Sequence, residues 1–179
     1  MKFNSFNLLK IFFSFTLSVV IIFNAKCNEI SSPKWMDLVP KNAYDFVPET
    51  GVTDEMWEDE GFLKKVEKAG LLVNKDLVGK KIRIDGFMVP LDFDYGEALT
   101  VEEFVLVPDA GMCIHVPPPP PNQMILVKLK SPEKVRFMYQ PIVIEGVLKN
   151  TKPVEEIYNS IYEMEAESIK DIDMDELNY

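Results

Sequence analysis

Residues 82–87 read Ile-Arg-Ile-Asp-Gly-Phe, and residues 142–147 repeat that arrangement as Ile-Val-Ile-Glu-Gly-Val. Apolar residues at every second position place one face of a strand against a core, and a glycine after the alternation marks a bulge or bend. The strands of a small closed barrel coil sharply and need such bends. The two motifs therefore predict a mainly β chain with a small OB-like antiparallel barrel, and a β-sandwich is the competing architecture.

Four further runs have the character of strands and are separated by turn signals: residues 103–107, 112–116, 124–129 and 157–164. Together with the glycine motifs they predict five or six strands, in a barrel that spans residues 79–166. An acid-rich run begins at Glu163, and such runs are usually solvated. We therefore expect an acidic tail over residues 167–179.

The segment before the barrel, residues 28–78, predicts an extended arm followed by one or two short helices. Prolines alternate with aromatic and apolar residues up to Pro48, which favours an arm pinned to the barrel by its aromatic side chains. Thr53 is a suitable N-cap for a helical stretch that ends at Gly70, and Gly61 is expected to divide that stretch into two pieces.

The first 27 residues have the pattern of a secretory signal peptide. Lysines precede an apolar run over residues 11–23, and the small residues Ala25 and Cys27 follow it. The run is shorter than the roughly 20 residues that a membrane-spanning helix needs. We therefore expect cleavage after residue 27 and export to the periplasm, with a membrane-anchored form as the alternative.

The amino-acid composition excludes several classes of function. The 179 residues include 47% hydrophobic side chains, enough for one domain with a core. Acidic residues outnumber basic ones by 29 to 19, and a net charge of −10 argues against a nucleic-acid partner. Two cysteines and one histidine cannot supply a four-ligand Cys/His zinc site from one chain.

The lone histidine, His115, lies two residues after Cys113, the only cysteine left after the predicted cleavage. On a strand, positions i and i+2 project from the same face, so the thiol and the imidazole would be neighbours. Sulfur and imidazole nitrogen suit zinc or copper, which makes this pair a candidate metal site. Further ligands could come from Met112, Met124, Asp109, Glu103, water or a second chain in a homodimer. A reactive Cys/His pair and a purely structural role are the alternatives.

Five prolines follow directly: Pro117, Pro118, Pro119, Pro120 and Pro121, and then Asn122 and Gln123. Consecutive prolines form a stiff polyproline II rod without backbone donors, so they must lie at a surface or an edge. A rod that is already ordered loses little entropy on docking, which favours a ridge for a partner protein. The alternative is a rigid connection between two strands.

Enzymatic activity is the less expected class. The sequence contains no nucleophile elbow, no glycine-rich phosphate loop and no second histidine for proton transfer. The carboxylates are too scattered to identify an acid/base pair.

The string from Gly111 to Gln123 resembles the signature of a bacterial family known as domain of unknown function 3299. Similar matches occur at residues 35–40, 79–91 and 103–108, so the resemblance extends over nearly the whole chain after residue 27.

The resemblance implies an exported, periplasmic or lipid-anchored protein, often encoded beside an ABC transporter with a MacB-like or FtsX-like permease, in some bacteria under zinc-responsive control. It implies an accessory protein of an envelope ABC transporter and assigns no reaction. Cys113, His115, Asn122 and Gln123 match the family motif, whereas a clear lipobox and a histidine-rich stretch are missing here. A metal-free interaction module that uses the proline ridge is the alternative function.

Overall fold

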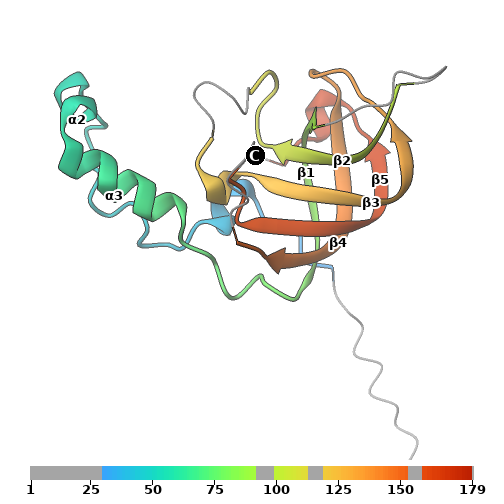
Figure 1. Ribbon diagram of the computed structural model, residues 1–179, viewed down its shortest axis with the longest axis horizontal. Helices are drawn as coiled ribbons and strands as arrows, with labels where there is room; N and C mark the ends of the chain where they lie inside the picture. The colour runs from blue at the N-terminus through green and yellow to red at the C-terminus, as the bar shows by residue number, and fades with distance from the viewer. Residues whose placement is uncertain (1–29, 92–98, 113–118, 153–158, 179) are drawn as a thin grey trace, which may run out of the picture.

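The computed structural model describes residues 30–91, 99–112, 119–152 and 159–178. Five strands form a closed barrel in the order β1-β2-β3-β5-β4, with β4 pairing back onto β1 (Figure 1). The strands are β1 (Lys81–Pro90), β2 (Thr100–Val107), β3 (Ile125–Lys134), β4 (Pro141–Asn150) and β5 (Tyr162–Asp171). Neighbouring strands are antiparallel except β3 and β5, which are parallel. The predicted OB-like barrel is confirmed, and the sandwich alternative is wrong.

Both glycine motifs lie where strands approach one another most closely. A Cβ atom on Gly86 of β1 would lie 2.5 Å from the carbonyl oxygen of Val107 on β2. A Cβ atom on Gly146 of β4 would overlap the carbonyl oxygen of Glu165 on β5, next to a register shift between Glu145 and Gly146. The predicted bulge is confirmed at Gly146, whereas at Gly86 the structure shows a close approach of β2 without a register shift.

The inward faces of the strands build the main core. Its largest fully buried members come from all five strands and from the segment before the barrel: Leu38, Ile82, Ile84, Met88, Phe104, Leu106, Ile125, Ile142, Ile144 and Tyr162. A smaller cluster of Phe87, Val105, Val107 and Met124 lies apart from this core.

The acid-rich run that begins at Glu163 is a strand of the barrel and not a solvated tail as far as Asp171. Its acids alternate with Met164 and Ala166, which are buried, so the carboxylates point outward while the apolar residues enter the core. Glu163 pairs with Lys128 at 2.9 Å, and Glu165 pairs with Lys149 at 3.3 Å. Cross-strand charge pairing therefore explains a composition that by itself predicts a tail.

Two helices precede the barrel, α2 (Asp54–Glu58) and α3 (Glu60–Gly70), and they project to one side of it (Figure 1). Thr53 is the N-cap residue of α2, as predicted, although its side chain accepts no capping hydrogen bond. The division falls at Asp59 and not at Gly61, because the Asp59 carboxylate accepts a 2.6 Å hydrogen bond from the Phe62 amide and starts a new helix. No helix in the described ranges is long and apolar enough to cross a membrane.

The arm is pinned to the barrel by Trp35, whose indole nitrogen donates a 2.7 Å hydrogen bond to the carbonyl of Asp85. It is less extended than predicted, because Trp35–Leu38 form a 3-10 helix, η1. Two further 3-10 turns are η2 (Pro121–Gln123) and η3 (Met174–Glu176). The strand predicted over residues 112–116 lies outside the described residues except for Met112, which belongs to no strand.

Candidate functional site

The predicted metal-binding pair, Cys113 and His115, lies outside the described residues, as do Pro117 and Pro118 of the proline run. Their juxtaposition therefore stays a prediction. The structure does place the residues on either side of this segment, Met112 and Pro119.

The segment begins at a fixed point on the barrel. Gly111 has a φ of +75°, a left-handed conformation that favours glycine, and Met112 packs on the cluster around Phe87 and Met124. Met124 is 1% exposed, so its thioether is enclosed by apolar side chains. The other suggested additional ligands, Asp109 and Glu103, are exposed. Within the part of the chain that the structure describes, no three Cys, His, Asp or Glu side chains cluster as a metal site would require.

The segment ends where the proline run meets the helical arm. Pro119 is buried and Pro120 is exposed, with φ −55° and ψ 145°, close to polyproline II geometry. The rod stops at Pro121, where η2 begins. This end of the run therefore presents Pro120 to solvent from a fixed backbone.

Asn122 ties the end of the rod to helix α3. Its side chain is fully buried, and its amide nitrogen donates hydrogen bonds to the carbonyls of Ala69 (2.9 Å) and Leu72 (3.3 Å). Carbonyls at a helix C-terminus lack partners within the helix, and the Asn122 side chain supplies a donor there in addition to the Leu72 amide, which donates a 3.1 Å hydrogen bond to the Ala69 carbonyl. Asn122 was predicted to contact a partner, but here it is enclosed within the chain itself.

Two more contacts complete the joint. A Cβ atom on Gly70 would lie 3.0 Å from Cδ of Pro121, so the helix end and the proline run are in close contact. The side-chain nitrogen Nε2 of Gln123 donates a 3.0 Å hydrogen bond to the carbonyl of Trp35 in the arm. The proline run therefore ends in a three-way joint of barrel, arm and α3.

One part of this joint has unpaired polar atoms. The Tyr44 hydroxyl and the Asn122 side-chain oxygen are buried without hydrogen-bond partners in the described structure. Burial raises the pKa of Tyr44, and the nearby Asn122 side chain offsets part of that rise. The two side chains are thus neighbours that face each other without a hydrogen bond of good geometry.

A second surface feature was missed by the sequence reasoning. Phe137, Met138 and Tyr139, in the loop between β3 and β4, are 87%, 54% and 66% exposed. The sequence does contain a signal for this feature, because three consecutive apolar residues between two strands are unusual on a solvated turn.

The chain is similar to a protein family and to solved structures. A family model described as "Protein of unknown function (DUF3299)" matches residues 35–171, which include the arm, both helices and all five strands. The chain belongs to the DUF3299 family. No curated protein matches it.

The solved structures include a DUF3299 family protein from Pseudomonas aeruginosa PAO1, at 29% sequence identity and a TM-score of 0.55. The match covers 80% of this chain and 97% of the Pseudomonas chain. A second match is the OBody AM3L09 bound to hen egg-white lysozyme, at 16% identity and a TM-score of 0.33, covering 54% of this chain and 85% of the OBody. Membership of DUF3299 brings no activity with it, so the function has to be argued from the residues.

Proposed function

We propose that the chain is an exported accessory protein of an envelope ABC transporter and acts as a protein–protein interaction module through its proline ridge, residues 117–121. The localisation rests on the signal-peptide pattern of residues 1–27, and the transporter on the family resemblance of the sequence. The structure contributes the support for the mode of action.

The observation that carries the proposal is the way the end of the ridge is held. Pro120 is exposed, while its neighbours Pro119 and Asn122 are buried and Asn122 is hydrogen-bonded to α3. An exposed proline on a backbone fixed from both sides is ordered before it meets a partner. Docking then costs little conformational entropy, which is the usual advantage of proline-rich recognition segments.

The test is site-specific photo-crosslinking in the native host, with a photoreactive amino acid at Pro120 and a matched probe at the exposed Lys65 of α3. We expect Pro120 to give a product that contains a subunit of an envelope ABC transporter, and Lys65 to give none. Equal yields from both positions, or a product without a transporter subunit, would contradict the proposal.

A second candidate function is contact with zinc or copper through Cys113 and His115. It is favoured by their i and i+2 spacing within a short segment that is tethered at Met112 and at the buried Pro119. One thiolate and one imidazole are soft enough for either metal, and other ligands would complete the coordination.

Titration of the reduced protein with Zn²⁺ or Cu⁺ against a chromophoric chelator tests this candidate. We expect uptake that is lost in Cys113→Ser and in His115→Ala, and retained in Asn42→Ala as a surface control. Uptake that survives both substitutions would place the metal elsewhere, and no uptake would end the metal hypothesis.

A further inference from the structure

The loop between β3 and β4 presents an apolar tip, Phe137, Met138 and Tyr139, with most of its side-chain surface in water. Exposed apolar side chains at three consecutive positions are unusual on a soluble surface and commonly mark a binding site. Successive side chains of a loop point in different directions. A flat surface would therefore cover only part of this tip, whereas a hollow could enclose it.

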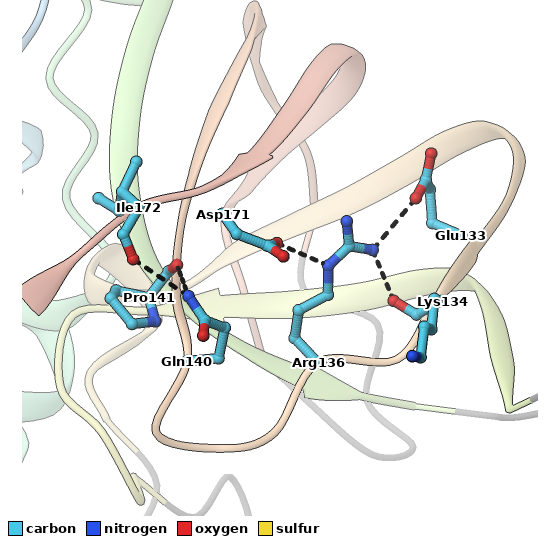
Figure 2. A network of polar contacts seen from close by, with 7 residues as sticks. All are labelled: Glu133, Lys134, Arg136, Gln140, Pro141, Asp171 and Ile172. Atoms are coloured by element: carbon cyan, nitrogen blue, oxygen red, sulfur yellow. Dashed lines mark hydrogen bonds and ion pairs between the residues drawn. The ribbon is translucent and has the colours of Figure 1, made fainter.

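The tip stands on a braced base (Figure 2). Arg136 donates hydrogen bonds to Asp171 (2.9 Å), Glu133 (3.1 Å) and the carbonyl of Lys134 (2.6 Å). The side-chain nitrogen Nε2 of Gln140 donates hydrogen bonds to the carbonyls of Pro141 (3.0 Å) and Ile172 (3.1 Å). Since both flanks are anchored, the tip is presented in one arrangement and loses little entropy on docking.

Acidic side chains lie next to this base along the chain, together with the exposed Lys134. The chain after Ile172 continues from the hydrogen bond to Gln140 into Asp173, Asp175 and Glu176, all exposed. Tyr139 lies beside Gly111, because a Cβ atom there would be 3.8 Å from Cε1 of the tyrosine, and exposed Asp109 precedes that glycine. The tip is therefore an apolar knob with an acidic collar, which is unfavourable toward an anionic lipid surface.

A hollow with the opposite character lies on the same chain. Its volume is about 510 Å³, and it is lined by Pro40, Leu71, Leu72, Val73, Lys75, Val78 and Asn150. Leu71 and Leu72 are 45% and 39% exposed. Lys75 is the charged residue of the lining, and Lys41, exposed, follows Pro40. This groove is apolar at its centre, and its rim carries Lys75 and Lys41 together with the exposed Asp76, which follows Lys75.

The tip of a chain cannot enter the groove of that same chain. Only Gln140 separates the tip from Pro141 at the start of β4, and the groove is lined by Asn150 at its end, so the full length of β4 lies between them. Ten residues of strand span roughly 30 Å. Any contact between these two surfaces must therefore join two molecules.

We propose that the tip of one molecule docks into the groove of a second copy of this chain, so that molecules associate head to tail. The apolar knob fills the apolar hollow, and the acidic collar faces Lys75 and Lys41. Such an interface is heterologous, because it uses different surfaces on the two molecules, and it leaves a free tip and a free groove at the ends.

Three side chains cannot bury the roughly 1,200 Å² of the smallest stable interfaces, so the association is weak. It is measured by sedimentation velocity at about 0.1 to 1 mM protein, where contacts of this strength become populated. We expect the mean sedimentation coefficient to rise with concentration. The rise should be smaller at high salt, which screens the contact between collar and rim.

Two variants give the sharpest test. Phe137→Ser with Met138→Ser removes the tip, and Leu71→Glu with Leu72→Glu closes the groove. Each variant alone should stay monomeric, whereas an equimolar mixture should form a 1:1 dimer, because one partner keeps its groove and the other its tip. The control Leu63→Ser removes an apolar side chain of 41% exposure from α3 and should associate as the unmodified chain does.

The proposal is overturned if the unmodified chain stays monomeric over this concentration range, or if the mixture of variants does not associate. It is also overturned if the tip instead binds phosphatidylcholine vesicles in a flotation assay and the tip substitutions abolish that binding. Far-UV circular dichroism checks that the variants fold. The Pro120 crosslink is a separate readout, so failure here leaves the transporter proposal standing.

Discussion

The hydroxyl of Tyr162, on the last strand of the barrel, donates a 2.6 Å hydrogen bond to the backbone carbonyl of Leu38, which lies 124 residues earlier in the arm. The same oxygen accepts a 2.7 Å hydrogen bond from the amide of Asn74, in the connection between α3 and β1. Tyr162 is fully buried, so one side chain joins the arm and the connection to the barrel core without leaving its own polar atom unpaired.

Tyr162→Phe should lower the free energy of unfolding by about 2 kcal/mol, because the Leu38 carbonyl and the Asn74 amide lose their partner while the ring is kept. Urea unfolding followed by circular dichroism measures this change. Tyr139→Phe, at an exposed position, is the matched control and should change stability by less than about 0.5 kcal/mol. Equal effects at the two positions would contradict the role assigned to Tyr162.

Burial raises the pKa of Tyr162 above its ordinary value of 10.0, and burial raises that of Tyr44 as well. The folded protein therefore holds these protons more tightly than the unfolded chain does. Their contribution to stability is complete below about pH 10 and is lost as the pH rises from there through the folded pKa values. We expect the urea midpoint to fall as the pH rises above about 10, less steeply in Tyr162→Phe. An unchanged slope in that variant would show that other groups control the alkaline limit.

Gly146→Ala should destabilise the barrel by about 1 to 3 kcal/mol, because the added methyl would press on the Glu165 carbonyl and on the Met164 side chain. Thermal unfolding measures the loss. Ser131→Thr also adds one carbon to a strand, at an exposed position of β3, and should leave stability nearly unchanged. A tolerated alanine at 146 would mean that β5 can move away at little cost.

The glycine motifs, and hence the barrel, were predictable because local alternation and a close backbone approach leave a direct trace in the sequence. The ends of the strands were less predictable, because β3 continues to Lys134 although its apolar run ends at Leu129. The identity of β5 was hidden further, because its outward glutamates pair with lysines that are distant in sequence, such as Lys81, 2.6 Å from Glu167. Composition records the acids and not the partners that make them favourable in a strand.

The candidate site was only partly predictable for a similar reason. The stiffness of the proline run follows from residue type alone, and Pro120 has the expected dihedral angles. The inward direction of the Asn122 side chain could not be predicted from residue type. Its acceptors, the carbonyls of Ala69 and Leu72, are about 50 residues away in sequence, and only the fold brings them near. A motif can thus identify an unusual segment without telling which of its side chains serve the fold and which face a partner.

Arg136→Met should loosen the β3–β4 loop, because it removes the guanidinium hydrogen bonds to Glu133, Asp171 and the Lys134 carbonyl. The ion pairs are partly exposed, so we expect a loss of only about 1 kcal/mol in global stability. Hydrogen exchange should report the change more clearly, as faster exchange of the amides of residues 135–140. Lys130→Met, at an exposed position of β3, is the control and should leave that exchange unaltered. No acceleration in Arg136→Met would mean that Gln140 alone fixes the loop.

Asn122→Ala should separate the stability of the helical arm from that of the barrel. The substitution removes the side-chain donor of the Leu72 carbonyl and one of the donors of the Ala69 carbonyl, which keeps its hydrogen bond from the Leu72 amide, at a cost of about 1 to 3 kcal/mol. Because the strands of the barrel make none of these bonds, the loss should appear as faster hydrogen exchange in residues 60–72 while strands β1 and β4 stay protected. Asn42→Ala, at an exposed position, should leave both regions unchanged. If the barrel amides accelerate together with those of α3, arm and barrel unfold as one unit, and the proline ridge is held by the whole domain and not by this joint.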